Sequence, residues 1–221
     1  MGTNTINGVA IQDWCLHTGT IIAQIHCPWP GLARITCLAL TRPPHSGSYV
    51  MGFVLADTKG WLDTPGTPPF EVVPLQTFDK LREAVNDGTA HFFMWEYFTS
   101  KKYYDDGAIK QIGEIYTPWS SWKIVAADPE DDRLSGMFES IDKGVAYFNA
   151  HQEEAVEYIS TSLDYSAADA RAWLGTVKFA EGVRGVSAAT IGNTIEVLRK
   201  AGVIEGRDVR ADSMIGVKRL E

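Results

Sequence analysis

Short apolar runs alternate with capped helical segments between residues 46 and 127, and this alternation constrains the fold more than any other feature. The runs "FEVVPL", "HFFMWE", "IKQIGEIY" and "WKIVAA" have the length of buried strands. Thr77 is positioned to begin the helical segment after the first run, and Gly88 to end it. Strands joined by helical crossovers predict an α/β fold with a largely parallel sheet.

Beyond residue 127 the apolar residues follow a helical period, and Ser166-Ala-Ala-Asp169 resembles a capping box. The last residues are polar. The sequence therefore predicts four parts. They are an anomalous, poorly structured N-terminal segment (1–45), an α/β lobe (46–127), a C-terminal helical region (128–206) and a flexible tail (207–221).

Residues 1–45 differ in composition from the rest of the chain. They contain all three cysteines, Cys15, Cys27 and Cys37, but neither Lys nor Glu, and prolines interrupt any regular period. Two interpretations remain open: an irregular extension, or a segment foreign to the fold, such as a misread exon. We favour the second.

The charge balance excludes some functions. Lys and Arg number 20 and Asp and Glu 28, which gives a net charge of −8. An acidic chain lacks the basic face that nucleic-acid binding requires. No apolar run has the length of a membrane span. A secretory leader begins with basic residues, but the first Lys or Arg of this sequence is Arg34, so we expect no leader. Three cysteines without a glycosylation sequon predict a reducing compartment, so we expect cytoplasmic localisation.

Two short motifs are candidate binding sites. Ser46-Gly47-Ser48-Tyr49 opens a helical segment, whose free N–H groups suit a carboxylate, phosphate or sulfonate; an ordinary helix cap, with Ser48 as the capping residue, explains the same residues. Trp95 and Glu96 end a strand, where a ring can stack on a heterocycle and a carboxylate can accept hydrogen bonds. A core tryptophan beside a solvated glutamate is the alternative.

Residues with the spacing of a catalytic or metal site are not found. The Cys and His residues before position 46 match no closed zinc pattern. Ser140 and Lys143 fit a Ser-x-x-Lys acylation motif, but its partner motifs are absent. We therefore predict no catalytic residue, no metal and no cofactor.

Three stretches carry a resemblance to a known family: "SGSYVMGFVLADTKGWL", "FEVVPLQTFDKLREAVNDGTAHFFMWEYFTSKKYYDDGAIKQIGEIYTPWSSWKIVA" and "YFNAHQEEAVEYISTSLDYSAADARAWLGTVKF". They are similar to the fungal periplasmic-binding-protein-like proteins of the type II solute-binding superfamily. Relatives of that family include aminopyrimidine- and sulfonate-binding proteins and thiamine-pyrimidine synthases. The resemblance covers residue 46 to about residue 204 and implies a two-lobed fold, here with an incomplete first lobe.

The resemblance also implies roles for the candidate residues. In the family, the turn at Ser46–Tyr49 holds an anion, and an aromatic–acid pair lies near Trp95 and Glu96. The chain crosses between lobes near Trp119 and Trp122, so these rings are expected to line the interlobe cleft; rings that pack the hinge are the alternative.

We expect a non-catalytic binding protein for a small solute, anionic or heteroaromatic, such as a thiamine-pyrimidine precursor or a sulfonate. The alternatives are an enzyme similar to the thiamine-pyrimidine synthases and a truncated remnant without binding activity of its own. The expected partners are the small ligand and a homodimer or second chain that completes the cleft, with no nucleic acid and no membrane.

Overall fold

The computed structural model describes residues 9–16, 20–24, 37–40, 47–62, 69–117, 119, 122–204 and 208–219. They fall into two compact units. We call them the mixed-sheet unit (residues 18–117 and 196–205) and the antiparallel-sheet unit (1–17, 118–195 and 206–221). No helix in these described ranges is long and apolar enough to cross a membrane.

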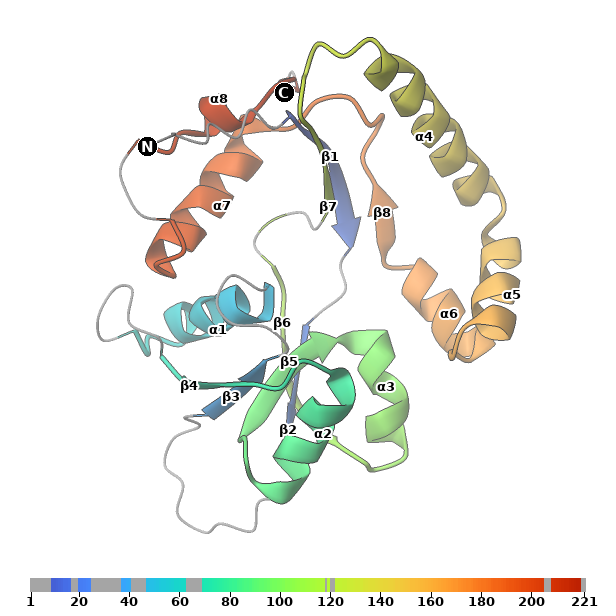
Figure 1. The fold of residues 1–221 in the computed structure, drawn as a ribbon. Helices are drawn as coiled ribbons and strands as arrows, with labels where there is room; N and C mark the ends of the chain where they lie inside the picture. The colour runs from blue at the N-terminus through green and yellow to red at the C-terminus, as the bar shows by residue number, and fades with distance from the viewer. Residues whose placement is uncertain are drawn as a thin grey trace. The chain divides into compact units, whose positions relative to one another are not determined.

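The mixed-sheet unit is built from strands that alternate with helices (Figure 1). Its elements are β2 (Thr20–Gln24), β3 (Cys37–Leu40), α1 (Gly47–Thr58), β4 (Glu71–Pro74), α2 (Phe78–Asp87), β5 (Phe92–Glu96), α3 (Tyr97–Asp105) and β6 (Lys110–Ile115).

The sheet of this unit has the strand order β4-β3-β5-β2-β6. Strand β3 is parallel to both β4 and β5, whereas β2 is antiparallel to both β5 and β6. Helices α1 and α2 return the chain between the parallel strands, as helical crossovers must. The predicted α/β fold with a parallel sheet is thereby confirmed.

Helices cover both faces of this sheet. Phe93 packs with Cys37 and Ala39 of β3 and with Leu81 of α2. On the other face, Leu38 lies against Gly52 of α1. Three consecutive residues of β5, Phe92, Phe93 and Met94, are fully buried, so both faces of the strand lie in the core.

The predicted boundaries of α2 are confirmed. The Thr77 hydroxyl accepts a hydrogen bond from the Lys80 N–H at 3.3 Å, and Gly88 ends the helix in the left-handed conformation, with φ 82°. The polar stretch after β5 forms helix α3, and the Glu96 carboxylate caps its first turn.

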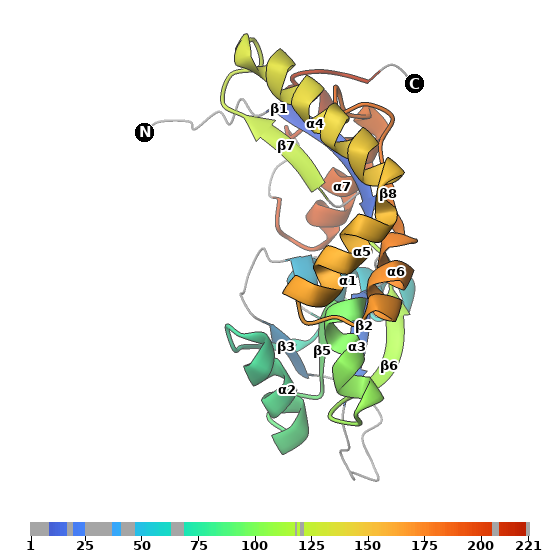
Figure 2. The ribbon, with the colours of Figure 1, turned by 90° about the vertical axis from the view of Figure 1, so that its right-hand side faces the viewer.

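The antiparallel-sheet unit combines a sheet of order β7-β1-β8 with a series of helices (Figure 2). Both β7 and β8 pair antiparallel to β1. Of the predicted capping box at α6, the cap is present: Ser166 Oγ accepts a hydrogen bond from the Asp169 N–H at 3.0 Å and donates to the Asp169 carboxylate at 2.7 Å. Its elements are β1 (Val9–Leu16), β7 (Trp122–Ala126), α4 (Arg133–Ala150), α5 (Gln152–Ser162), α6 (Ala167–Leu174), β8 (Val177–Phe179), α7 (Ala188–Lys200) and α8 (Ala211–Met214).

The observed units depart from the predicted parts. Strands β1, β2 and β3 lie within residues 1–45, where we expected no regular structure, because pairing with distant strands supplies what the local sequence lacks. Strand β7 belongs to the second sheet and not to the predicted lobe of residues 46–127. Helix α7 ends in the mixed-sheet unit, where Lys200 Nζ lies 2.7 Å from Asp57 Oδ2 of α1.

The predicted flexible tail, residues 207–221, is partly ordered. It contains α8, and its end runs beside the loop before α7. Val186 donates its N–H to the Val217 carbonyl and accepts from the Arg219 N–H, both at 3.0 Å. The Arg219 guanidinium donates to the Gly182 carbonyl at 2.7 Å.

Gly185 permits this close contact. Its φ is 86°, and a Cβ at this position would lie 3.1 Å from the Arg219 nitrogen. We expect Gly185→Ala to lower the free energy of unfolding by about 2–3 kcal/mol, because left-handed strain and a backbone clash add. Urea denaturation measures the loss. Gly182→Ala is the control, since Gly182 has φ 74° but open space around it; it should lose only about 1 kcal/mol. Equal losses would show that the contact with Arg219 adds nothing.

Candidate functional site

Three helices of the mixed-sheet unit begin where parallel strands end. Helix α1 follows β3, α2 follows β4 and α3 follows β5. Because these strands point the same way, the three N-termini lie at one edge of the sheet. In open α/β sheets, ligands bind outside this carboxyl edge, and helix N-termini there favour anions.

The first candidate motif lies at this edge. Ser46 falls outside the described residues, and α1 begins at Gly47. Ser48 therefore lies within the first turn instead of capping the helix as predicted, and its hydroxyl donates to the Met94 carbonyl at 3.3 Å. This bond fixes the start of α1 against β5. Tyr49 turns along the helix to meet Phe53, with 5.2 Å between ring centroids.

Gly47 leaves the backbone at the start of α1 accessible. The residue is exposed, and a Cβ added there would meet no heavy atom of the described residues within 4 Å. The described residues therefore leave space for a side chain at this position.

Trp95 is half-buried and contacts the core. Its ring stacks on Phe78 of α2, with centroids 4.9 Å apart and planes 16° apart. It packs against the same cluster as Phe93, on the face of the sheet opposite α1. Its predicted stacking on a ligand stays a prediction, and the contact observed is internal.

Glu96 is used as a helix cap. Its Oε1 accepts from the Phe98 N–H at 3.0 Å, and its Oε2 accepts from the N–H and the hydroxyl of Thr99, both at 2.7 Å. The carboxylate thus occupies the N-terminus of α3 and satisfies its donors. Its predicted bond to a ligand amino group stays a prediction.

The two remaining candidates, Trp119 and Trp122, belong to the antiparallel-sheet unit. Trp119 is half-buried. The backbone of Trp122 begins β7 and pairs with Trp14, while its side chain lies outside the described residues. The structure brings Ser48 and the end of β5 together; the position of the two tryptophans in a cleft stays a prediction.

Gln76 is a feature of the carboxyl edge that the sequence did not indicate. It has φ 66°, a left-handed value that is unusual for a residue other than glycine, and it lies two residues after the end of β4. The Thr77 N–H donates to the Leu75 carbonyl at 2.8 Å, so Gln76 is the central residue of a γ-turn of the rare form. Neither Gly nor Asn marks this turn in the sequence.

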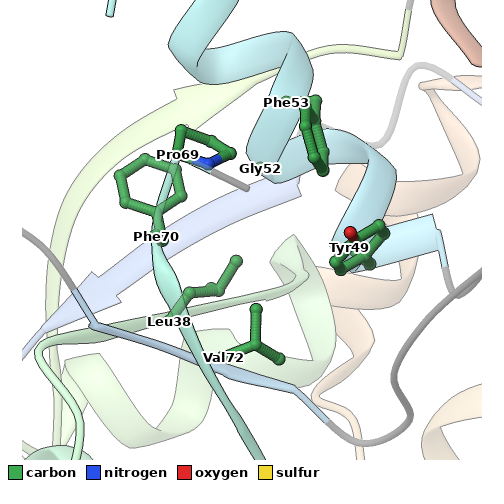
Figure 3. A pocket seen from close by; sticks show the side chains of 7 residues that line it. All are labelled: Leu38, Tyr49, Gly52, Phe53, Pro69, Phe70 and Val72. Carbon is green, nitrogen blue, oxygen red and sulfur yellow. The ribbon is translucent and has the colours of Figure 1, made fainter. Parts of the chain in front are cut away.

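An apolar pocket lies beside α1 (Figure 3). Its empty volume is about 170 Å³, part of which is open to solvent. Binding sites for organic ligands usually span about 300–1,000 Å³, so this pocket is smaller than that range. Its lining residues are Leu38, Tyr49, Gly52, Phe53, Pro69, Phe70 and Val72.

The described residues contain no group of His, Cys, Asp and Glu side chains that is able to hold a metal ion. Cys37 is buried in β3, and burial together with the nearby Glu71 carboxylate raises the pKa of its thiol. A thiol with a raised pKa is a poor nucleophile. His91 accepts a hydrogen bond from the Cys37 N–H at 3.2 Å, which gives it a structural role.

Known structures share this fold. Over residues 33–115 the chain matches the family model described as Ca3427-like PBP. It is similar to the Candida albicans CA3427 gene product, which defines a family with the generic periplasmic binding protein fold. Identity is 35% and the TM-score 0.79, over 96% of this chain and 73% of that one. A search of curated proteins found no match.

Two bacterial sulfonate-binding proteins have the same fold at low identity. The aliphatic sulphonate binding protein SsuA of Escherichia coli is 13% identical, with a TM-score of 0.68 over 95% of this chain and 73% of that one. The alkanesulfonate-binding protein SsuA of Xanthomonas axonopodis pv. citri, bound to MOPS, is 11% identical, with a TM-score of 0.66 over 94% and 73%.

Fold and sequence together therefore define a protein of the periplasmic-binding-protein type II class. Within that class, the chain belongs to the Ca3427-like family. The prediction that the resemblance begins only at Ser46 was wrong, because the family match begins at residue 33 and the C. albicans structure aligns with 96% of the chain.

The Glu96 cap has a measurable consequence. We expect Glu96→Ala to lower the free energy of unfolding by about 1–2 kcal/mol, because two N–H groups of α3 lose their acceptor. Glu96→Asp should recover part of the loss, since aspartate is a good cap. The control Glu83→Ala alters an exposed position of α2 and should change stability by less than about 0.5 kcal/mol. Urea denaturation followed by circular dichroism measures the free energy of unfolding of all three variants. If Glu96→Ala leaves this free energy unchanged, the cap is excluded as a source of stability.

Proposed function

We propose that this chain is a non-catalytic binding protein for a small anionic solute, which is held at the N-terminus of α1. Membership in a family with the periplasmic binding protein fold supports a binding role. The two sulfonate-binding structures, which share the fold alone, support an anion as the ligand class. Ser46, Gly47, Ser48 and Tyr49 form the proposed cradle.

One observation carries the choice of α1. Of the three helices that begin at the carboxyl edge, α2 is capped by the Thr77 hydroxyl, which accepts from the Lys80 N–H, and α3 by the Glu96 carboxylate, which accepts from the Phe98 and Thr99 N–H groups. Helix α1 begins at an exposed glycine with open space around it. We therefore place the ligand anion at the dipole of α1, beside the exposed backbone of Gly47.

Ser48 and Glu96 then act as positioning residues. The Ser48 hydroxyl holds the first turn of α1 on the Met94 carbonyl. Glu96 satisfies α3, so its negative charge is balanced by donors of its own helix. Trp95, Trp119 and Trp122 remain candidates for contact with a heteroaromatic part of the ligand, as the family resemblance implies.

The proposal predicts a charge-sensitive site. Calorimetric titration in Tris buffer would use three probes: MOPS, an organic phosphate ester and an aminopyrimidine. We expect an anionic probe to bind. Gly47→Asp should weaken its binding at least about tenfold, because a second anion competes for the helix N-terminus and repels the ligand. The open space at Gly47 should leave the fold intact.

Gly136→Asp is the matched control, because Gly136 is also an exposed helical glycine with open space. It lies in α4 of the other unit and should leave binding unchanged. If the anionic probe binds the Gly47→Asp variant as tightly as the unchanged protein, the start of α1 is excluded as the binding site. If no anionic probe binds while circular dichroism shows that the protein is folded, the proposal of an anionic ligand is wrong.

A further inference from the structure

Gln76 combines a strained backbone with a side-chain amide that has no internal partner. Among the described residues, it alone has a positive φ without being glycine. Its side chain is exposed and makes no hydrogen bond within the part of the chain that the structure describes. No side-chain contact seen in the structure therefore compensates for the cost of its left-handed conformation.

The turn at Gln76 does not itself require a glutamine. The Thr77 N–H closes the turn on the Leu75 carbonyl at 2.8 Å, and Thr77 then caps α2. Both bonds use groups other than the Gln76 side chain, and glycine enters the left-handed region without the cost that a Cβ brings. Strained residues of this kind cluster at ligand-binding sites, where the side chain has a use that offsets the strain.

The strand register places Gln76 at the carboxyl edge of the mixed sheet. Strand β4 pairs parallel to β3 with Pro74 opposite Leu40, and β5 lies on the other side of β3. Gln76 follows Pro74 by two residues, at the edge where the Met94 carbonyl holds Ser48. Two strand spacings, about 10 Å, separate β4 from β5. A small organic anion seated at the start of α1 is long enough for its far end to meet a glutamine side chain there.

We propose that Gln76 is a specificity-determining residue, which binds an uncharged polar group at the end of the ligand opposite its anion. This inference rests on the proposed function, in which the start of α1 holds the anion. A side-chain amide both donates and accepts hydrogen bonds, so it suits a hydroxyl, an ether oxygen or a ring nitrogen. The ligand class is thus a small anion that carries such a group about two strand spacings from its charge.

The first test compares two sulfonates by calorimetric titration in Tris buffer. MOPS has a sulfonate at one end and a polar morpholine ring at the other, whereas hexanesulfonate has an alkyl chain in place of the ring. Gln76→Ala should weaken the binding of MOPS about fivefold, which is the loss of one hydrogen bond, and leave hexanesulfonate unchanged. An unchanged affinity for MOPS overturns the proposal. Equal losses for both sulfonates overturn it as well, because Gln76 then has only a structural role.

Gln111→Ala is the matched control. It removes another exposed amide of the same sheet, on β6 at the edge opposite β4, and should change neither affinity.

The second test separates the side chain from the backbone strain. Gln76→Gly should lose as much affinity for MOPS as Gln76→Ala, because both variants lack the amide. Its midpoint of urea denaturation should exceed that of Gln76→Ala by about 0.5 M, since alanine keeps the strain of a left-handed Cβ and glycine does not. If Gln76→Gly binds MOPS as the unchanged protein does, the side chain has no role in binding. Equal midpoints would show that the turn is not strained. Either result overturns the proposal.

Gly47→Asp distinguishes a failure of this inference from a failure of the proposed function. If Gly47→Asp weakens both sulfonates and Gln76→Ala weakens neither, the anion site stands and the role of Gln76 is wrong. If the unchanged protein binds neither sulfonate, both proposals are wrong.

Discussion

The parallel pairing of β3 with β4 and β5 is the constraint on which the mixed-sheet unit depends. Because these strands share a direction, the chain must cross back between them, and the helices that do so cover both faces of the sheet. The strands are therefore apolar at successive positions, as Phe92, Phe93 and Met94 show. The same pairing brings three helix N-termini to one edge, so the position of the candidate site follows from strand direction.

Local signals made much of this unit predictable from sequence. Thr77 and Gly88 mark α2 by chemistry that acts within a few residues, and the apolar runs mark β4, β5 and β6 by length alone. Strands β1, β2 and β3 escaped prediction because their partners are distant: β1 pairs with residues near 125 and 178, and β2 with β5 and β6. Composition misled us there, since Cys37 is a core residue of β3.

The position of the candidate residues in the sheet was predictable, but their contacts were not. An aromatic residue and an acid at a strand end indicated the carboxyl edge correctly. Their side chains, however, turn to internal partners: Trp95 to Phe78, and Glu96 to the first turn of α3. Side chains at consecutive strand positions point to opposite faces, so two neighbours in sequence rarely serve one ligand. The γ-turn at Gln76 had no sequence signal, because its left-handed residue is neither Gly nor Asn.

The acidic balance of the chain bears on how an anion is held. With a net charge of −8, the long-range field opposes a negative ligand, so the proposed binding of an anion would have to rest on short-range donors. Backbone N–H groups at a helix start are such donors, and they need no neighbouring cation. Thr77 accepts from one such donor at α2, and Glu96 accepts from two at α3. The proposed function therefore places the anion at α1, where Gly47 is exposed and Ser48 fixes the first turn against β5.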